Sequence, residues 1–162
     1  STPEQAEAIV QSMKYTPRGG RGVIVRAALD DYTTGDTMQK LAAANERTTL
    51  FAQIETAEGV ENAAAIAAID GVDCLWVGHF DLSCSLGIPA QFDHPKFIEA
   101  DAKVIAAAKG AGKALGRLVP NVAEGLARCG DGYDFIAYSA DAWLLGDALA
   151  AALGELRAGA GS

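Results

Sequence analysis

Two acidic residues, Glu55 and Asp81, occupy positions where a hydrophobic segment gives way to a loop. Glu55 closes TTLFAQIE, and Asp81 lies in LWVGHFDLSCSLGIP. If both segments are strands of one sheet, one wall of the fold presents both carboxylates together. Carboxylate oxygens suit Mg²⁺ or Mn²⁺, and two protein ligands leave the rest of about six positions for water and substrate. The pattern predicts a catalytic metal site.

Residues near these carboxylates extend the predicted site. Strand side chains alternate between faces, so Gln53 shares the face of Glu55. Gly78 permits close backbone approach to a ligand, and the N–H groups of Phe80 and Asp81 are suited to a substrate carboxylate. Two other interpretations stay open: Glu55 caps the next helix or faces solvent, and Asp81 caps the turn DLSCSLG. Either role of Asp81 predicts that it is buried near the strand end.

Other polar residues are weaker candidates. His79 invites assignment as a base, but adjacent loop residues point in different directions, so its proximity to Asp81 does not bring it into the site. His94 precedes a proline at a helix start and is expected in a loop or capping role. Arg117 and Leu118 must face opposite sides of a strand, and the inner place is assigned to Leu118.

Hydrophobic segments alternate with helical patterns along the chain. After a first helix that begins at Thr2 and ends near residues 15–17, residues 22–27 form a short strand candidate and residues 36–45 a helix. Strands are expected at 48–55, 73–78, 113–119 and 133–139. The helices that follow them are expected at 58–69, 94–112, 121–130 and 141–156. These four strand-helix units predict an α/β fold with parallel pairing.

Four such units match half of a (β/α)₈ TIM barrel, which typically needs ~250 residues. No GxGxxG or P-loop follows the first strand, which argues against a nucleotide-binding sheet. Residues 1–157 are therefore expected to form the C-terminal half of one barrel domain, followed by a flexible tail at 158–162. Half a barrel exposes strand edges and apolar inner faces. We expect a longer polypeptide, or another chain, to supply the missing N-terminal half.

Composition narrows the possible partners. The net charge of -8 disfavours nucleic acid and anionic membrane surfaces. Three cysteines without a CxxC pair indicate a reducing, cytoplasmic setting. No stretch approaches the ~20 apolar residues of a membrane span, and no targeting segment is recognisable.

Several separated motifs carry a resemblance to a known family. QIETAEGVEN, GVDCLWVGHFDLSCSLGIP, GKALG and FIAYSADAWLL, in this order and spacing, resemble the HpcH/HpaI aldolase/citrate lyase family. The resemblance implies a class II TIM-barrel aldolase that reversibly cleaves 4-hydroxy-2-oxo acids to pyruvate and an aldehyde. Its divalent metal would be Mg²⁺ or Mn²⁺, with Co²⁺ as a further possibility.

The same resemblance assigns roles to residues of this chain. It implies that Glu55 and Asp81 bind the metal and that Gln53 orders water or substrate. The amides of Phe80 and Asp81 would hold the pyruvate carboxylate, and Leu118 would line the pocket. The family's histidine base and arginine come from early strands, which this chain does not contain, so the isolated chain is expected to be inactive.

The sequence alone leaves the substrate, the reaction subclass and the assembly undecided. GHFDLS departs from the family's more usual GPADLS, which leaves the aldehyde substrate undetermined. A citrate lyase-like acyl-CoA lyase of the same fold is one alternative, and a catalytically incomplete fragment or assembly module is another. The alanine-rich segment DALAAALGEL is suited to association of outer helices, so a homo-oligomer is expected.

Overall fold

A four-stranded parallel sheet forms the centre of the computed structural model, which describes residues 1–161. Its strands are β1 (Phe51–Ile54), β2 (Cys74–Val77), β3 (Ala114–Val119) and β4 (Phe135–Tyr138). They pair in chain order, and helices occupy each connection. Consecutive strands of a (β/α)₈ barrel have this arrangement. The expected α/β class and the four strand-helix units are confirmed.

The helices follow the predicted alternation, with a 3₁₀ turn before the second. They are α1 (Pro3–Met13), η1 (Ala28–Asp30), α2 (Thr37–Arg47), α3 (Ala57–Glu61), α4 (Ala63–Ala67), α5 (His79–Ser85), α6 (Pro95–Gly110), α7 (Val122–Asp131) and α8 (Asp141–Ala160). Side-chain caps fix several of their starts. Thr2 forms a capping box with Gln5, and Thr56 accepts a hydrogen bond from the Gly59 N–H at 2.9 Å. Within residues 1–161, no helix combines the length and apolar character needed to cross a membrane.

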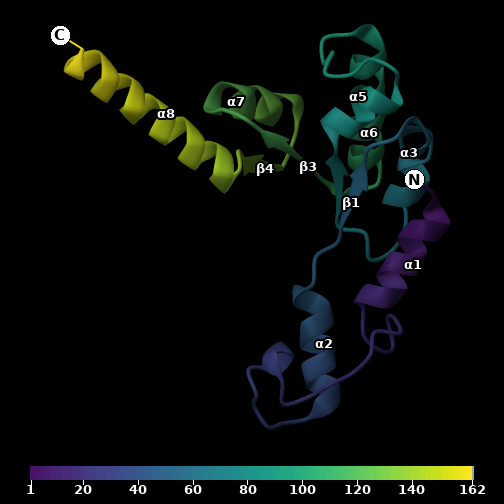
Figure 1. Ribbon diagram of the computed structural model, residues 1–162. Helices are drawn as coiled ribbons and strands as arrows, with labels where there is room; N and C mark the ends of the chain where they lie inside the picture. The colour runs from purple at the N-terminus through teal and green to yellow at the C-terminus, as the bar shows by residue number, and fades with distance from the viewer. Residues whose placement is uncertain (162) are drawn as a thin grey trace.

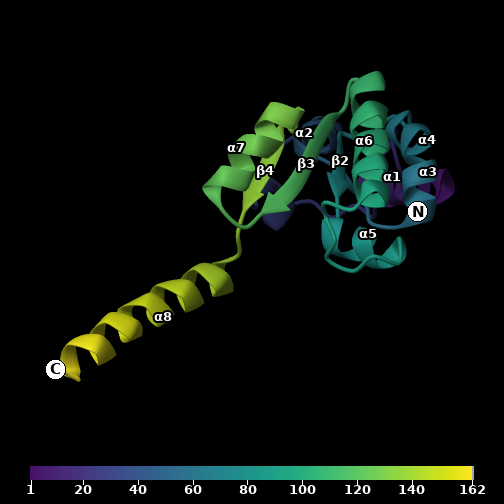
Figure 2. The ribbon, with the colours of Figure 1, turned by 90° about the horizontal axis from the view of Figure 1, so that it is seen from above.

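Helices cover one face of the sheet only (Figures 1 and 2). Strand residues Ile54, Leu75 and Leu115 point to that face and pack in one core with α1, α4 and α6. The opposite face is apolar but open, since Phe51 is 38% exposed and Phe135 is 47% exposed. The chain therefore builds one wall of a barrel with its helical coat, and the inner surface lies uncovered.

Four local expectations need correction. Residues 22–27 form no strand; Val23 to Val25 are exposed and pair with no strand of the described sheet. The single helix expected at 58–69 is two short helices that meet at Asn62. The first five residues of the turn expected at DLSCSLG, 81–85, lie in helix α5. The helix expected at 141–156 continues to Ala160, and Ser162 lies outside the described part.

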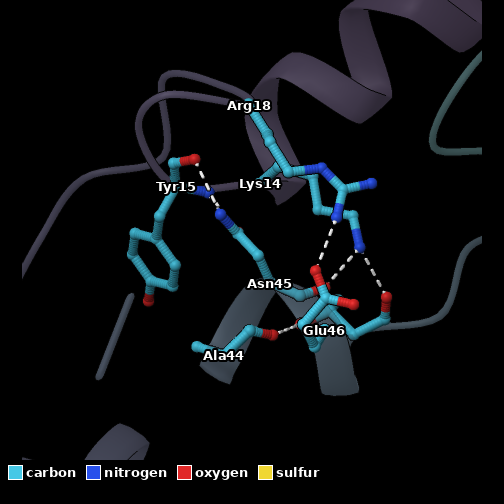
Figure 3. A network of polar contacts seen from close by, with 7 residues as sticks. Lys14, Tyr15, Arg18, Ala44, Asn45 and Glu46 are labelled. Atoms are coloured by element: carbon cyan, nitrogen blue, oxygen red, sulfur yellow. Dashed lines mark hydrogen bonds and ion pairs between the residues drawn. The ribbon is translucent and has the colours of Figure 1, made fainter. Parts of the chain in front are cut away.

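Helix α2 lies apart from the sheet and is joined to the end of α1 by a polar network (Figure 3). The Asn45 side chain accepts from the Tyr15 N–H at 2.7 Å and donates to the Tyr15 carbonyl at 2.9 Å. The buried Lys14 ammonium donates to the carbonyls of Asn45 and Thr48 at 2.7 and 2.6 Å. Because these groups have little access to water, their pairing fixes how α2 follows α1.

Helix α8 extends away from the rest of the molecule (Figures 1 and 2). All of its residues are exposed, including Trp143, Leu145 and Leu149. A helix with apolar residues on several sides is normally buried against other protein.

Candidate active site

The C-terminal ends of β1 and β2 meet at Glu55 and Gly78. Glu55 directly follows β1, and the Gly78 N–H donates to the Ile54 carbonyl at 3.0 Å. A Cβ added to Gly78 would lie 2.9 Å from the Glu55 Cβ and 2.9 Å from the Gln53 Nε2. Glycine is therefore required here for close approach, because its backbone touches two predicted site residues.

Gln53 and Glu55 contact each other. The Gln53 amide donates to the Glu55 carboxylate, as expected for alternate residues on one strand face. An amide hydrogen bond of this kind fixes the orientation of a ligating carboxylate. Glu55 does not cap the next helix, because Thr56 fills that role.

Asp81 lies in the first turn of α5, three residues after the N-cap Gly78. It is exposed, so the expectation that it is buried was wrong, and it is not the N-cap. The reason is that the chain turns into a helix at once after β2, which carries Asp81 above the sheet edge. The Ser85 hydroxyl accepts from the Ala57 N–H at 3.0 Å, so the segments that follow β1 and β2 are tied together.

His79 is buried and packs among aromatic rings. Its ring centroid lies 4.9 Å from that of Phe80 and 5.2 Å from that of Phe92, which precedes α6. Burial, with a smaller contribution from the nearby Arg117 cation, lowers the pKa of His79 to about 4. The imidazole is therefore neutral at pH 7, and its contacts are those of a packed side chain.

The first turn of α5 is also braced by Ser83. This fully buried hydroxyl donates to the Phe80 carbonyl at 2.6 Å and accepts from the Ala90 N–H at 2.9 Å. The loop between α5 and α6 is thus held against the turn that carries Phe80 and Asp81. This role of Ser83 was not predicted from the sequence, although a serine at the centre of DLSCS is a signal for local hydrogen bonding.

Arg117 and Leu118 face opposite sides of β3, as predicted. Arg117 is buried on the helix-covered face, 3.3 Å from a Glu124 carboxylate oxygen and 5.9 Å from the centroid of the Tyr133 ring. Leu118 takes the other, inner face. His94 is the N-cap of α6, where its Nδ1 accepts from the Lys96 N–H at 3.2 Å, which confirms the capping interpretation.

The donor set fits a divalent cation that is shared with substrate. No cluster of three or more His, Cys, Asp or Glu side chains occurs among residues 1–161, so a closed protein-only metal cage is absent from that part of the chain. Glu55 and Asp81 follow adjacent strands, and Asp81 is open to solvent. Oxygen ligands in an open site are the arrangement that Mg²⁺ and Mn²⁺ accept.

The inner face also holds Trp76, which was not predicted as a site residue. Trp76 pairs in register with Gln53 and therefore lies on the same face of the sheet. The alternation that placed Gln53 beside Glu55 also applies to Trp76, which is two residues before Gly78. That signal was present in the sequence.

Comparison with known proteins agrees with this architecture. Over 151 residues the chain is 39% identical to a hydroxypyruvate/pyruvate aldolase of Chromohalobacter salexigens, covering 89% of this chain and 56% of that protein. It is 36% identical over 140 residues to a 5-keto-4-deoxy-D-glucarate aldolase of Shigella boydii, covering 86% and 54%. The chain thus spans just over half the length of these relatives.

A solved structure of an HpcH/HpaI aldolase from Desulfitobacterium hafniense superimposes with a TM-score of 0.87 at 29% identity, covering 96% of this chain and 60% of that one. Parallel strands in chain order, helices on one face and carboxylates at adjacent strand ends define a protein of the (β/α)₈-barrel class. The profile of HpcH/HpaI aldolase/citrate lyase matches residues 1–148, and the chain belongs to this family.

Proposed function

We propose that the chain carries the metal- and pyruvate-binding part of a class II aldolase that reversibly cleaves a 4-hydroxy-2-oxo acid to pyruvate and an aldehyde. The observation that carries this proposal is the meeting of Glu55, Gln53 and the Gly78 turn at the ends of two adjacent strands. The names of the relatives, a hydroxypyruvate/pyruvate aldolase and a keto-deoxy sugar acid aldolase, support the same reaction class.

Each site residue has a distinct part in this proposal. Glu55 and Asp81 would hold Mg²⁺ or Mn²⁺, with Co²⁺ as a further candidate. When bound, such a cation supplies positive charge where negative charge develops on the 2-oxo oxygen as the carbon–carbon bond breaks. Gln53 orients the Glu55 carboxylate and orders water or substrate. The N–H groups of Phe80 and Asp81 receive the substrate carboxylate, and Leu118 lines the pocket.

Complete turnover in this proposal needs groups from outside the chain. The inner face of the sheet is open, and the base and the cation at the aldol hydroxyl have no assigned residue here. We therefore infer that further barrel strands, from the same polypeptide or from another, cover this face and supply both groups. Three free cysteines support a cytoplasmic location, and the exposed α8 supports a homo-oligomer.

Pyruvate release from a 4-hydroxy-2-oxo acid tests the reaction. A polypeptide that contains this chain within a complete barrel is expected to release pyruvate in the presence of Mn²⁺, and its Glu55→Gln variant is expected to release at least about 100-fold less. Malyl-CoA serves as the second substrate, because its preferential cleavage would favour an acyl-CoA lyase. Metal-independent release of pyruvate would refute the proposal.

A further inference from the structure

Trp76 lies on the inner face of the sheet, one side-chain layer below Glu55. Its register partners are Gln53 on β1 and Gly116 on β3. Residues on one strand rise about 3.3 Å each, so the layer of Gln53 and Trp76 lies roughly 7 Å from that of Glu55 and Gly78. Any ligand that binds at Glu55 and extends into the barrel meets this layer first.

The indole of Trp76 extends sideways across the sheet. A Cβ added to Gly116 would be 2.8 Å from the Trp76 Cε3, so the indole lies directly on the glycine backbone of β3. Its centroid is 6.1 Å from the Phe51 ring and 6.0 Å from the Phe135 ring, both in edge-on geometry. These contacts hold the indole flat over β3, below Leu118, which follows Gly116 by two residues.

The same side chains line a hollow on the inner face. Its lining residues are Phe51, Gln53, Trp76 and Phe135, and its volume is about 320 Å³. Gln53, which contacts Glu55, shares one layer with Trp76 and Phe135, and Phe51 lies one layer lower. The aromatic rings of Trp76 and Phe135 in this layer limit how deep a ligand that binds at Glu55 can enter.

We propose that Trp76 forms the floor of the 2-oxo acid pocket and selects for a small substituent at C3, so that pyruvate is accepted and bulkier 2-oxo acids are rejected. This inference rests on the proposed function and adds a specificity-determining residue to it. Gly116 takes part indirectly, because only a residue without a side chain leaves room for the indole in this position. One excluded methylene in an apolar pocket changes selectivity by about 10- to 200-fold.

Binding of two 2-oxo acids to the Mn²⁺-loaded chain tests the proposal. The probes are pyruvate and 3-methyl-2-oxobutanoate, which has two additional methyl groups on C3, and binding is followed by the relaxation of Mn²⁺-coordinated water protons. The wild-type chain is expected to prefer pyruvate, and Trp76→Leu is expected to reduce that preference at least about 10-fold. Trp143→Leu is the control, because Trp143 is exposed on α8 and does not line the hollow; it should leave the preference unchanged.

A second measurement does not depend on how well Trp76→Leu folds. Trp76 and Trp143 are the only two tryptophans, and Trp143 lies on α8. In the Trp143→Phe variant, pyruvate added with Mn²⁺ is expected to change the fluorescence of Trp76. Pyruvate binding without any fluorescence change, or an equal shift of preference in Trp76→Leu and Trp143→Leu, would overturn the inference and leave the proposed function intact. If the wild-type chain with Mn²⁺ binds no pyruvate, both fail.

Discussion

Replacing Gly78 by alanine tests the packing at the centre of the site. The φ angle of Gly78 is -82°, which alanine adopts without strain, so the effect of the substitution is steric. The added Cβ would lie 2.9 Å from both the Glu55 Cβ and the Gln53 Nε2. Ordinary contacts of a Cβ begin near 3.4 Å, so these neighbours must move by about 0.5 Å, the difference between 3.4 and 2.9 Å.

Overpacking of this size typically costs about 1–3 kcal/mol. If the strain is relieved by displacing Glu55, the same energy appears as weaker metal binding, and 1.4 kcal/mol corresponds to a factor of ten. We therefore expect Gly78→Ala to weaken Mn²⁺ binding roughly 10- to 100-fold. Isothermal titration calorimetry measures the affinity, and circular dichroism verifies that the chain remains folded.

Gly110→Ala is the matched control, because no atom lies within 4 Å of the Cβ added at this position at the end of α6. It should bind Mn²⁺ as the wild-type chain does. A folded Gly78→Ala chain with wild-type Mn²⁺ affinity would show that contact between the Gly78 turn and Glu55 is irrelevant to the metal.

Three further predictions concern pH, stability and assembly. The pKa of His79 is about 4 in the folded chain and about 6.5 in the unfolded chain, so the unfolded chain binds the proton more readily, and the free energy of unfolding should fall by on the order of 3 kcal/mol as pH drops from 6.5 to 4. Urea unfolding of His79→Gln should show a flatter dependence of stability on pH. An unchanged slope would contradict the role given to His79. Asn45→Ala should lower the free energy of chemical unfolding by about 2–4 kcal/mol, because two backbone groups of Tyr15 lose their hydrogen-bond partners. The control Glu46→Ala removes an exposed ion pair and should lower it by less than about 1 kcal/mol. Equal losses of stability in the two variants would contradict this prediction. If α8 mediates a homo-oligomer, Leu149→Glu should shift sedimentation toward the monomer, and an unaltered oligomer would exclude this surface.

The periodicity of apolar residues and the capping residues at helix ends were sufficient to predict most of the fold. Alternating apolar strands and capped helices identified four units, because buried strands need apolar residues and helix starts need side-chain acceptors. The segment at 22–27 failed because β-branched residues indicate a strand only where a partner strand exists. Apolar pattern alone does not contain that tertiary information.

In the candidate site, too, features that depend on one strand were predicted from the sequence, and features that depend on tertiary packing were not. Alternation along β1 correctly put Gln53 beside Glu55, since that depends on one strand alone. The exposure of Asp81 was not predictable, because it depends on how tightly the chain enters α5 after β2. The bracing hydroxyl of Ser83 was missed for a related reason: its partner Ala90 lies in a loop whose course is set by packing.

Joint binding of one cation by Glu55 and Asp81 is the central claim, and a double-mutant cycle of Mn²⁺ affinity tests it most directly. The wild-type chain is expected to bind one Mn²⁺ at this site. Glu55→Gln and Asp81→Asn should each weaken Mn²⁺ binding by at least about 30-fold. In the double variant the loss of binding free energy should be smaller than the sum of the two single losses, because each change removes the same shared site. Strictly additive losses, or wild-type affinity in either single variant, would contradict the account.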